Sequence, residues 1–279
     1  MTTNPAVRRP PVRYVGGKWL LADWIIGFFP PHDHYVEPFC GGASVLFRKF
    51  PSRIETINDL DGEIVNFFRV LRERPAELIE LLELTPYARE ELNLARTEET
   101  ASDPVERARR FYVRSKMTYG GYQEHDSGWR YITNHHGCSS RLVREWNDLS
   151  GLEAAVNRLR QVQIEHADAL AVITRFDTPK TLFYVDPPYV LSTRSEMRTR
   201  YIHEMDDDAQ RELAAVLNGV QGMVVLSGYQ SPLYDELYPG WARRDVQTST
   251  NGNSVATESV WLSPRVCENA ALPLFGGEL

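Results

Sequence analysis

The stretch Thr181-Leu-Phe-Tyr-Val-Asp186-Pro187-Pro188-Tyr189 is an apolar run that ends in an acid, two prolines and an aromatic ring. Its first five residues are typical of a central strand that is covered on both faces. Because proline cannot donate a hydrogen bond to a sheet, Pro187 and Pro188 should end the strand and turn the chain outward. In open α/β sheets, ligands bind at this carboxyl edge.

The end of this strand predicts a pair of hydrogen-bond acceptors. Pro187 precedes another proline and is confined to extended conformations, which fixes the direction of its carbonyl. This carbonyl and the Asp186 carboxylate would lie beside the ring of Tyr189. A planar group that bears an NH2, such as a nucleobase amine, fits two acceptors and a flat ring. A Pro-Pro turn in which Asp186 is a simple cap explains these four residues equally well.

Strands and helices alternate around this stretch. Apolar runs predict strands at 35–39, 55–59, 161–165, 181–185 and 223–226, and a closing hairpin of 243–248 with 259–262. Helices are predicted at 43–50, 63–72 and 206–217. The pattern predicts an α/β fold with a mostly parallel, three-layer sheet. A helical, charge-rich segment interrupts it, so we expect residues 1–84 and 161–279 to form one domain, with residues 85–160 inserted.

Composition places the chain among soluble globular proteins. The chain has 279 residues and a net charge of -7, with 25% charged and 42% hydrophobic residues. It contains no apolar stretch near the roughly 20 residues that cross a membrane, and its first residues lack a signal-peptide core. We therefore expect a cytoplasmic protein. Cys40, Cys138 and Cys267 are odd in number and far apart, which favours reduced thiols over disulfides.

The middle of the chain is basic although the whole chain is acidic. Between Arg107 and Arg144, eight basic residues stand against two acids, and aromatic residues lie between them. Such a segment is a candidate nucleic-acid surface, because cations neutralise phosphates and aromatic rings stack on bases. A solvated, charged helix face is the alternative. The candidate DNA-binding residues are Arg114, Lys116, Tyr119, Tyr122, Arg130, Asn134, His135 and Arg141.

Two glycine turns and a strand-end acid indicate a nucleoside cofactor. Gly41 and Gly42 follow the first predicted strand and let a ligand approach the backbone closely. The turn matches neither of two phosphate-binding motifs, the Gly-x-Gly-x-x-Gly fingerprint and the Walker loop. Asp59 ends the second strand, where an acid commonly binds ribose hydroxyls. The turn before Lys18 ends in a cation that could hold a carboxylate. S-adenosylmethionine has both a ribose and a carboxylate, and it has no phosphate that would require a phosphate-binding loop.

Four motifs in this order resemble the Dam family of DNA adenine-N6 methyltransferases, the D12 class in its alpha arrangement. They are Tyr14-Val-Gly-Gly-Lys18, Val36-Glu-Pro-Phe-Cys-Gly-Gly-Ala-Ser-Val45, Asn58-Asp59 and Asp186-Pro-Pro-Tyr189. Weaker matches follow at 166–168, 226–229 and 258–262. The resemblance implies a Rossmann-like S-adenosylmethionine-dependent methyltransferase fold, with a mostly parallel seven-stranded sheet and a mainly helical target-recognition domain at 85–160.

The resemblance also implies roles for individual residues. Asp186 and Pro187 would accept the two N–H groups of the target amine, and Tyr189 would stack on a flipped base. Asp168 would face the adenine end of the cofactor, although capping the next helix explains it nearly as well. The implied cofactor-binding residues are Tyr14, Lys18, Glu37, Phe39, Gly41, Asp59, Asp168 and Asp186.

Several alternatives stay open from the sequence. Methylation of a cytosine N4 amine uses the same two acceptors, and a relative that only binds DNA could keep the motifs. The histidines near Cys138 match no common zinc spacing, so no metal is expected. The loop from Arg194 to His203 would lie near the target strand or be solvated. We expect double-stranded DNA as partner and a monomer, with a dimer open. The insertion lacks the sequence pattern shared by family members that methylate GATC. The sequence does not distinguish a phage enzyme from a host enzyme or from part of a restriction system.

Overall fold

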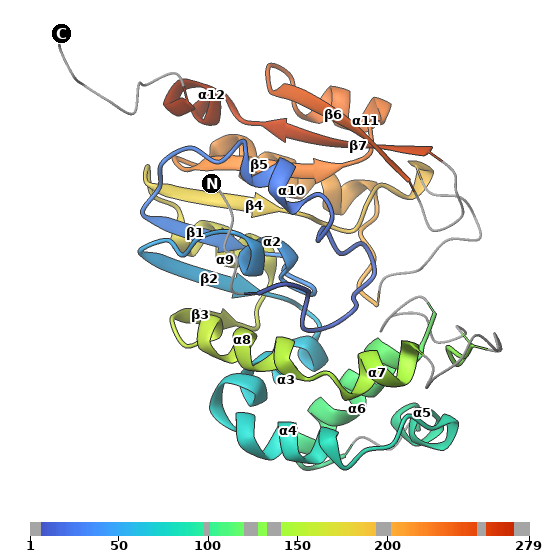
Figure 1. Ribbon diagram of the computed structural model, residues 1–279. Coiled ribbons are helices and arrows are strands. Elements are labelled where there is room, and N and C mark those ends of the chain that lie inside the picture. The colour runs from blue at the N-terminus through green and yellow to red at the C-terminus, as the bar shows by residue number, and fades with distance from the viewer. Residues whose placement is uncertain are drawn as a thin grey trace, which may run out of the picture.

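The strand β4 (Thr181–Val185) lies at the centre of a seven-stranded sheet. The structure is a computed structural model, and it describes residues 7–97, 101–119, 128–132, 141–193, 202–249 and 255–270. The strand order is β3-β2-β1-β4-β5-β7-β6, and only β7 runs antiparallel to its neighbours β5 and β6 (Figure 1). The predicted α/β class and the mostly parallel seven-stranded sheet are therefore confirmed.

The predicted strands and helices occur close to their expected places. The remaining strands are β1 (His34–Glu37), β2 (Ile54–Asn58), β3 (Val162–Glu165), β5 (Met223–Gly228), β6 (Ala242–Ser249) and β7 (Val255–Leu262). The helices are α1 (Ala22–Ile26), α2 (Ser44–Arg48), α3 (Gly62–Glu73), α4 (Pro75–Glu83), α5 (Arg89–Ala95), α6 (Pro104–Met117), α7 (Arg141–Asn147), α8 (Ser150–Leu159), α9 (Ala169–Phe176), α10 (Asp207–Gly219), α11 (Pro232–Leu237) and α12 (Pro264–Ala270), with a 3-10 turn at Leu191–Thr193. The hairpin of β6 and β7 is longer than predicted.

Strand β4 is buried on both faces, as its composition predicts. Successive side chains of a strand point to opposite faces. Leu182 and Tyr184 accordingly join one hydrophobic cluster, whereas Phe183 and Val185 join the other. All five residues of the strand are buried, which leaves only its carboxyl end open to a ligand.

The helices α4 to α7 gather beyond the β3 edge of the sheet (Figure 1). They are attached through α3, whose Phe67 ring lies 5.2 Å from that of Phe111 on α6. Helix α8 instead packs beside β3 and α3, and its Arg158 forms a buried ion pair with Glu55 of β2. The last ten residues of the expected insertion thus lie against the sheet. The division at 85 and 160 stays a prediction.

The register of the parallel strands determines where the site lies. β1 pairs with β2 on one side and with β4 on the other. Their carboxyl ends therefore meet at one edge, and residues that follow these strands face each other across it. No helix among the described residues is long and apolar enough to span a membrane.

Candidate active site

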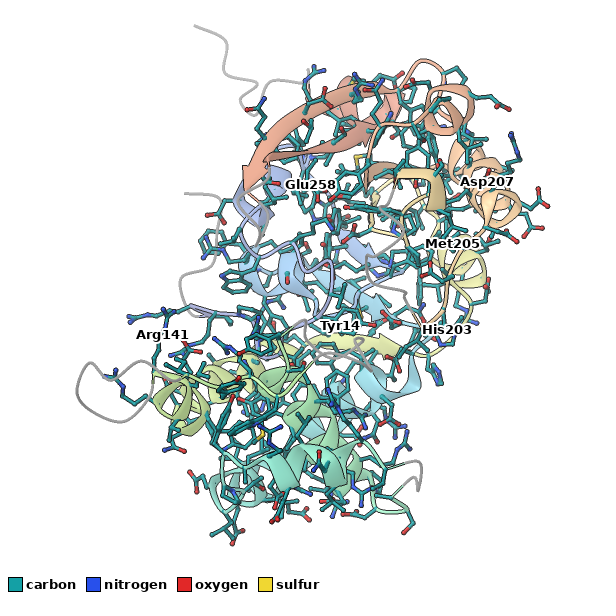
Figure 2. The ribbon with its side chains drawn as sticks, turned by 90° about the vertical axis from the view of Figure 1, so that its right-hand side faces the viewer. Tyr14, Arg141, His203, Met205, Asp207 and Glu258 are labelled. Carbon is teal, nitrogen blue, oxygen red and sulfur yellow. The ribbon has the colours of Figure 1, made fainter. Side chains whose placement is uncertain are left out.

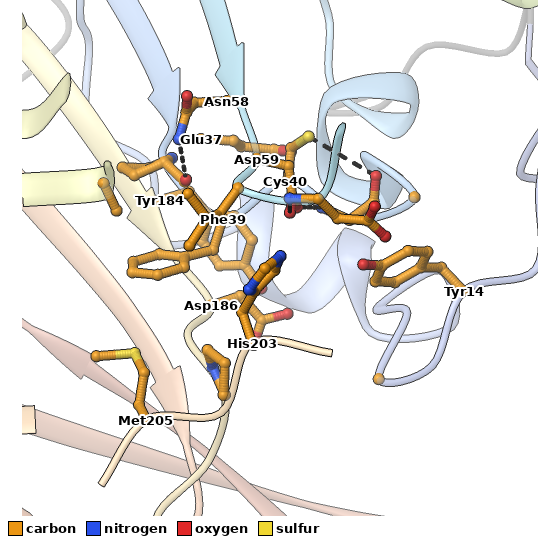
Figure 3. Close-up of a pocket in the computed structure, with 18 of the residues that line it drawn as sticks. Tyr14, Glu37, Phe39, Cys40, Asn58, Asp59, Tyr184, Asp186, His203 and Met205 are labelled. Carbon is orange, nitrogen blue, oxygen red and sulfur yellow. Dashed lines mark hydrogen bonds between the residues drawn. The ribbon is translucent and has the colours of Figure 1, made fainter. Parts of the chain in front are cut away.

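A cavity of about 230 Å³ opens at the carboxyl ends of β1, β2 and β4 (Figure 3). All eight residues predicted to bind the cofactor line it: Tyr14, Lys18, Glu37, Phe39, Gly41, Asp59, Asp168 and Asp186. They come from distant parts of the sequence and converge because the three strands are neighbours. Of the predicted catalytic residues, Asp186 lines the cavity, whereas Pro187 and Tyr189 are buried and do not line it.

The glycine turn after β1 is shaped by the ring of Tyr14. Gly41 has a φ of +45°, and a Cβ atom there would lie 2.8 Å from two atoms of the Tyr14 ring. Ala43, which begins the turn into α2, also has a left-handed backbone, with φ of 50°. Glycine at position 41 is therefore required both by its backbone and by the packing of Tyr14, which brings that ring to the wall of the cavity.

Asp59 is held by the main chain. Its two carboxylate oxygens accept the amide N–H groups of Gly41 at 2.8 Å and Asp61 at 2.9 Å. The preceding Asn58 donates to the carbonyls of Pro38 and Ala167, at 2.9 and 3.0 Å. These bonds tie the ends of β1, β2 and β3 together. Burial raises the pKa of Asp59, although both amide bonds act against this shift.

Lys18 connects the N-terminal turn to the end of β4. Its ammonium donates to the Gly16 carbonyl at 2.7 Å and forms an ion pair of 3.1 Å with Asp186 Oδ2. Burial raises the pKa of Asp186, an effect that the neighbouring Lys18 charge opposes. The other oxygen, Oδ1 of Asp186, is buried and has no hydrogen-bond partner among the residues that the structure describes. A buried acceptor of this kind is costly unless a ligand supplies a donor.

Glu37, at the end of β1, is a buried acid. Its Oε1 accepts the amide N–H of Leu46 at 2.8 Å and the hydroxyl of Tyr35. Burial raises its pKa to about 8, against the effect of both hydrogen bonds. Near neutral pH the Glu37 carboxyl is therefore mostly protonated, and it carries little of the negative charge of the cavity.

Two predicted residues have a second role in the structure. Asp168 lines the cavity and also caps α9, where it accepts the amide N–H of Leu170 at 2.9 Å. Tyr189 has 5% of its surface exposed and donates its hydroxyl to Glu258 at 2.9 Å. The carbonyl of Pro188, between Asp186 and Tyr189, accepts the side-chain amide of Gln210 at 2.7 Å.

The sequence of the chain matches one protein family over most of its length. The model for D12 class N6 adenine-specific DNA methyltransferases matches residues 14–250, which include the four motifs that line the cavity. The chain belongs to this family. Adenine is therefore the base that this methyltransferase modifies, and the cytosine-N4 alternative finds no support.

Curated relatives agree with the family. The methyltransferase is 26% identical over 259 residues to "Type II methyltransferase M1.LlaDCHI" of Lactococcus lactis subsp. cremoris, covering 88% of this chain and 89% of the relative. It is 23% identical to the "DNA N-6-adenine-methyltransferase" of Escherichia phage P1, covering 88% of this chain but 34% of the relative. It is also 23% identical to the "DNA adenine methylase" of Escherichia coli K12, covering 81% and 83%.

Some cavity residues of the methyltransferase were missed by sequence reasoning. His203, Glu204 and Met205 line the cavity, and Figure 3 shows the His203 ring between Phe39 and Tyr14. From the sequence, His203 was expected near the target strand or in a solvated loop. Asp61 also lines the cavity, and burial raises its pKa to about 6. The sequence does indicate a role for Asp61, because an acid directly before a predicted helix is typical of a helix cap, and Asp61 caps α3 in the structure.

The predicted DNA-binding residues are dispersed. Arg114 donates to the Ala95 carbonyl and pairs with Glu63 at 3.3 Å. Arg130 and Arg141 both pair with Glu145, at 3.2 and 2.7 Å. Figure 2 shows Arg141 on the opposite side of the molecule from His203, which lines the cavity.

Burial and the charges of Arg13, Arg9 and Arg130 lower the pKa of Lys116 to about 8. Tyr119 is half-exposed, and its hydroxyl donates to the carbonyl of Tyr131 at 3.2 Å. Tyr122, Asn134 and His135 lie outside the described residues. Contact with DNA stays a prediction for all eight.

Proposed function

We propose that this methyltransferase binds S-adenosylmethionine in the cavity at the ends of β1, β2 and β4, and methylates an adenine that has been flipped out of double-stranded DNA. The observation that carries the proposal is the Oδ1 atom of Asp186, a buried acceptor without a partner among the described residues. It lies at the end of the central strand, beside residues suited to the methyl donor. A donor from the substrate would satisfy it.

The charges of the cavity fit a cationic methyl donor. Apart from the mostly protonated Glu37, the described lining residues carry six carboxyl groups against one lysine and one histidine: Asp59, Asp61, Asp168, Asp186, Glu204 and Glu212 against Lys18 and His203. S-adenosylmethionine has two positive groups and one carboxylate, and when bound it supplies an activated methyl group. Lys18 would hold the carboxylate, Asp59 the ribose hydroxyls, and Asp168 the adenine end. Tyr14, Glu37, Phe39 and Gly41 would complete the pocket wall.

The residues after β4 would prepare the adenine amine for transfer. The lone pair of this amine is delocalised into the ring, which makes it a poor nucleophile. Acceptance of its two N–H groups by Asp186 and the Pro187 carbonyl favours a geometry in which the lone pair faces the methyl group. The Asp186 carboxylate then stabilises the positive charge that develops on the base. Since the amine lies inside a duplex, the base must leave the stack, and Tyr189 would stack on it.

The segment 85–160 would act as the target-recognition domain. Burial and the charges of nearby arginines lower the pKa of Lys116, and a phosphate group at this place would relieve the part that comes from repulsion between like charges. The half-exposed rings of Tyr119 and Tyr131 offer stacking surfaces nearby. In this proposal Arg114, Arg130 and Arg141 exchange part of their pairing with acids for phosphates.

The Asp186→Ala variant tests the proposal. It should reduce the transfer of labelled methyl groups to DNA below detection, because the amine loses its charged acceptor, while the melting temperature stays close to that of the wild type. The matched control is Asp33→Asn, an acid at the opposite edge of the same sheet that pairs with the exposed Lys180. The control should keep full activity. Full activity of Asp186→Ala would refute the assigned site, as would DNA that carries only methylcytosine.

A further inference from the structure

Glu258 lies on β7 at the edge of the sheet where the cavity opens. In the antiparallel pairing, Ser259 is opposite Gly228, the last residue of β5, so Glu258 stands one residue beyond that pair. The three residues that follow it are buried, with 1–2% of their surface exposed, whereas Glu258 is half-buried. The family match ends at residue 250, before this strand.

The carboxylate of Glu258 fixes the ring of Tyr189. The Tyr189 hydroxyl donates to Glu258 Oε2 at 2.9 Å. The same ring has the Lys18 ammonium 4.8 Å from its centroid and the Tyr229 ring at 4.7 Å, with an angle of 71° between the ring planes. Three groups from the N-terminal turn, the end of β5 and β7 therefore hold one ring, of which 5% is exposed.

Glu258 also belongs to the electrostatic surroundings of Asp186. Burial raises the pKa of Asp186, Lys18 opposes this, and the negative charge of Glu258 raises it further. Glu258 has no ion pair with a cation in the described part of the chain, and Arg243 of the adjacent β6 pairs with Asp235 and Asp245 instead. The Glu258 carboxylate thus acts on two residues that follow β4, Asp186 through its charge and Tyr189 through a hydrogen bond.

We propose that Glu258 is a positioning residue for methyl transfer, which holds the Tyr189 ring in the orientation that the flipped adenine stacks on. This inference rests on the proposed function, because Tyr189 needs a fixed orientation only if a base stacks there. Stacking sets the plane of the base, and the plane decides whether its amine meets Asp186. A ring free to rotate would bind the base in several planes, of which few are reactive.

The test compares four variants under single-turnover conditions with saturating S-adenosylmethionine and duplex DNA. Glu258→Ala should lower the rate of methyl transfer about tenfold, as expected for the loss of a hydrogen bond to a charged group. Tyr189→Phe keeps the ring but removes the hydroxyl, so it should show the same loss. The double variant should be no slower than either single variant. Glu258→Gln, which keeps an acceptor for the hydroxyl, should retain most of the rate.

Affinity measurements separate positioning from a structural role. The dissociation constant for S-adenosylmethionine, measured by calorimetry, should stay within about twofold of the wild type in all four variants. The matched control is Asp245→Asn, on the same hairpin, which keeps an acceptor for the Ser259 hydroxyl. A wild-type rate in Glu258→Ala, or losses that multiply in the double variant, would overturn the inference. If Glu258→Ala fails to fold, Tyr189→Phe is compared with its combination with Glu258→Gln. Equal rates of methyl transfer in these two would support the inference, and a further loss in the combination would overturn it. Asp186→Ala tests the proposed function separately, since its outcome does not depend on Glu258.

Discussion

The cavity at the ends of β1, β2 and β4 is lined mostly by acids, whereas the stretch 107–144 of the helical segment 85–160 is basic, and these opposite charges are held in different ways. In the cavity, the carboxylates accept hydrogen bonds from the main chain, as Asp59 does from Gly41 and Asp61. In the helical segment, the cations pair with acidic side chains, as Arg130 and Arg141 do with Glu145. Backbone amides are fixed by the fold, whereas side-chain ion pairs can be exchanged.

This difference suits two kinds of ligand. A small cofactor requires a site whose polar groups stay in place, because reorganisation would weaken its binding. A DNA backbone presents a row of phosphates that compete with carboxylates for the same arginines. We therefore expect variants in the cavity to have large effects on cofactor affinity, and variants in the helical segment to have small effects on DNA affinity.

Asp59→Ala should give the largest effect on cofactor affinity. The carboxylate is fixed by two amide groups, so its remaining acceptor positions are available to ribose hydroxyls. Hydrogen bonds to a charged group contribute about 1.5–3 kcal/mol, so calorimetry should show S-adenosylmethionine binding roughly 10- to 100-fold more weakly. Asp168→Asn is the control, because asparagine also caps a helix. It should lose less affinity than Asp59→Ala, and equal losses would contradict the assignment of Asp59.

Glu37→Gln should change the pH dependence of stability. Burial raises the pKa of Glu37 to about 8, above its ordinary value of 4.5. Between these values the folded protein binds the proton more tightly than the unfolded chain, so the wild type loses stability as the pH rises. Glutamine is neutral throughout and does not titrate. The melting temperature of Glu37→Gln should therefore fall less than that of the wild type between about pH 5 and about pH 9. Parallel curves would show that Glu37 does not titrate in this range.

The comparison also shows what the sequence could predict. Six of the eight residues predicted to bind the cofactor lie at or beside the ends of strands, and the order of parallel strands places such ends together. Tyr14 and Lys18 belong to the N-terminal turn instead. The convergence of all eight on one cavity followed from local motifs. The sheet itself could be predicted for the same reason, since the apolar runs of β4 and β5 indicate strands buried on both faces.

Contacts that depend on distant packing could not be predicted. His203 reaches the cavity because α10 is anchored to the end of β4, where the buried Gln210 donates to the Pro188 carbonyl. Arg114 meets Glu63, 51 residues earlier in the chain, because α6 packs on α3. No local spacing contains these pairings, so charge and composition indicated a basic segment without showing which of its cations already have acidic partners.

Glu145→Gln should give the smallest effect, in the opposite direction to the others. Glu145 holds both Arg130 and Arg141, and exposed ion pairs of this kind contribute about 0.2–1 kcal/mol. Removing its charge should release both arginines for phosphates and tighten the binding of duplex DNA about two- to threefold at low salt. The control is Glu236→Gln on α11, an exposed acid paired with Arg211, which changes the net charge equally. Fluorescence anisotropy over a series of salt concentrations measures both. Equal tightening in the two variants would mean that net charge alone is responsible, and that Arg130 and Arg141 do not contact DNA.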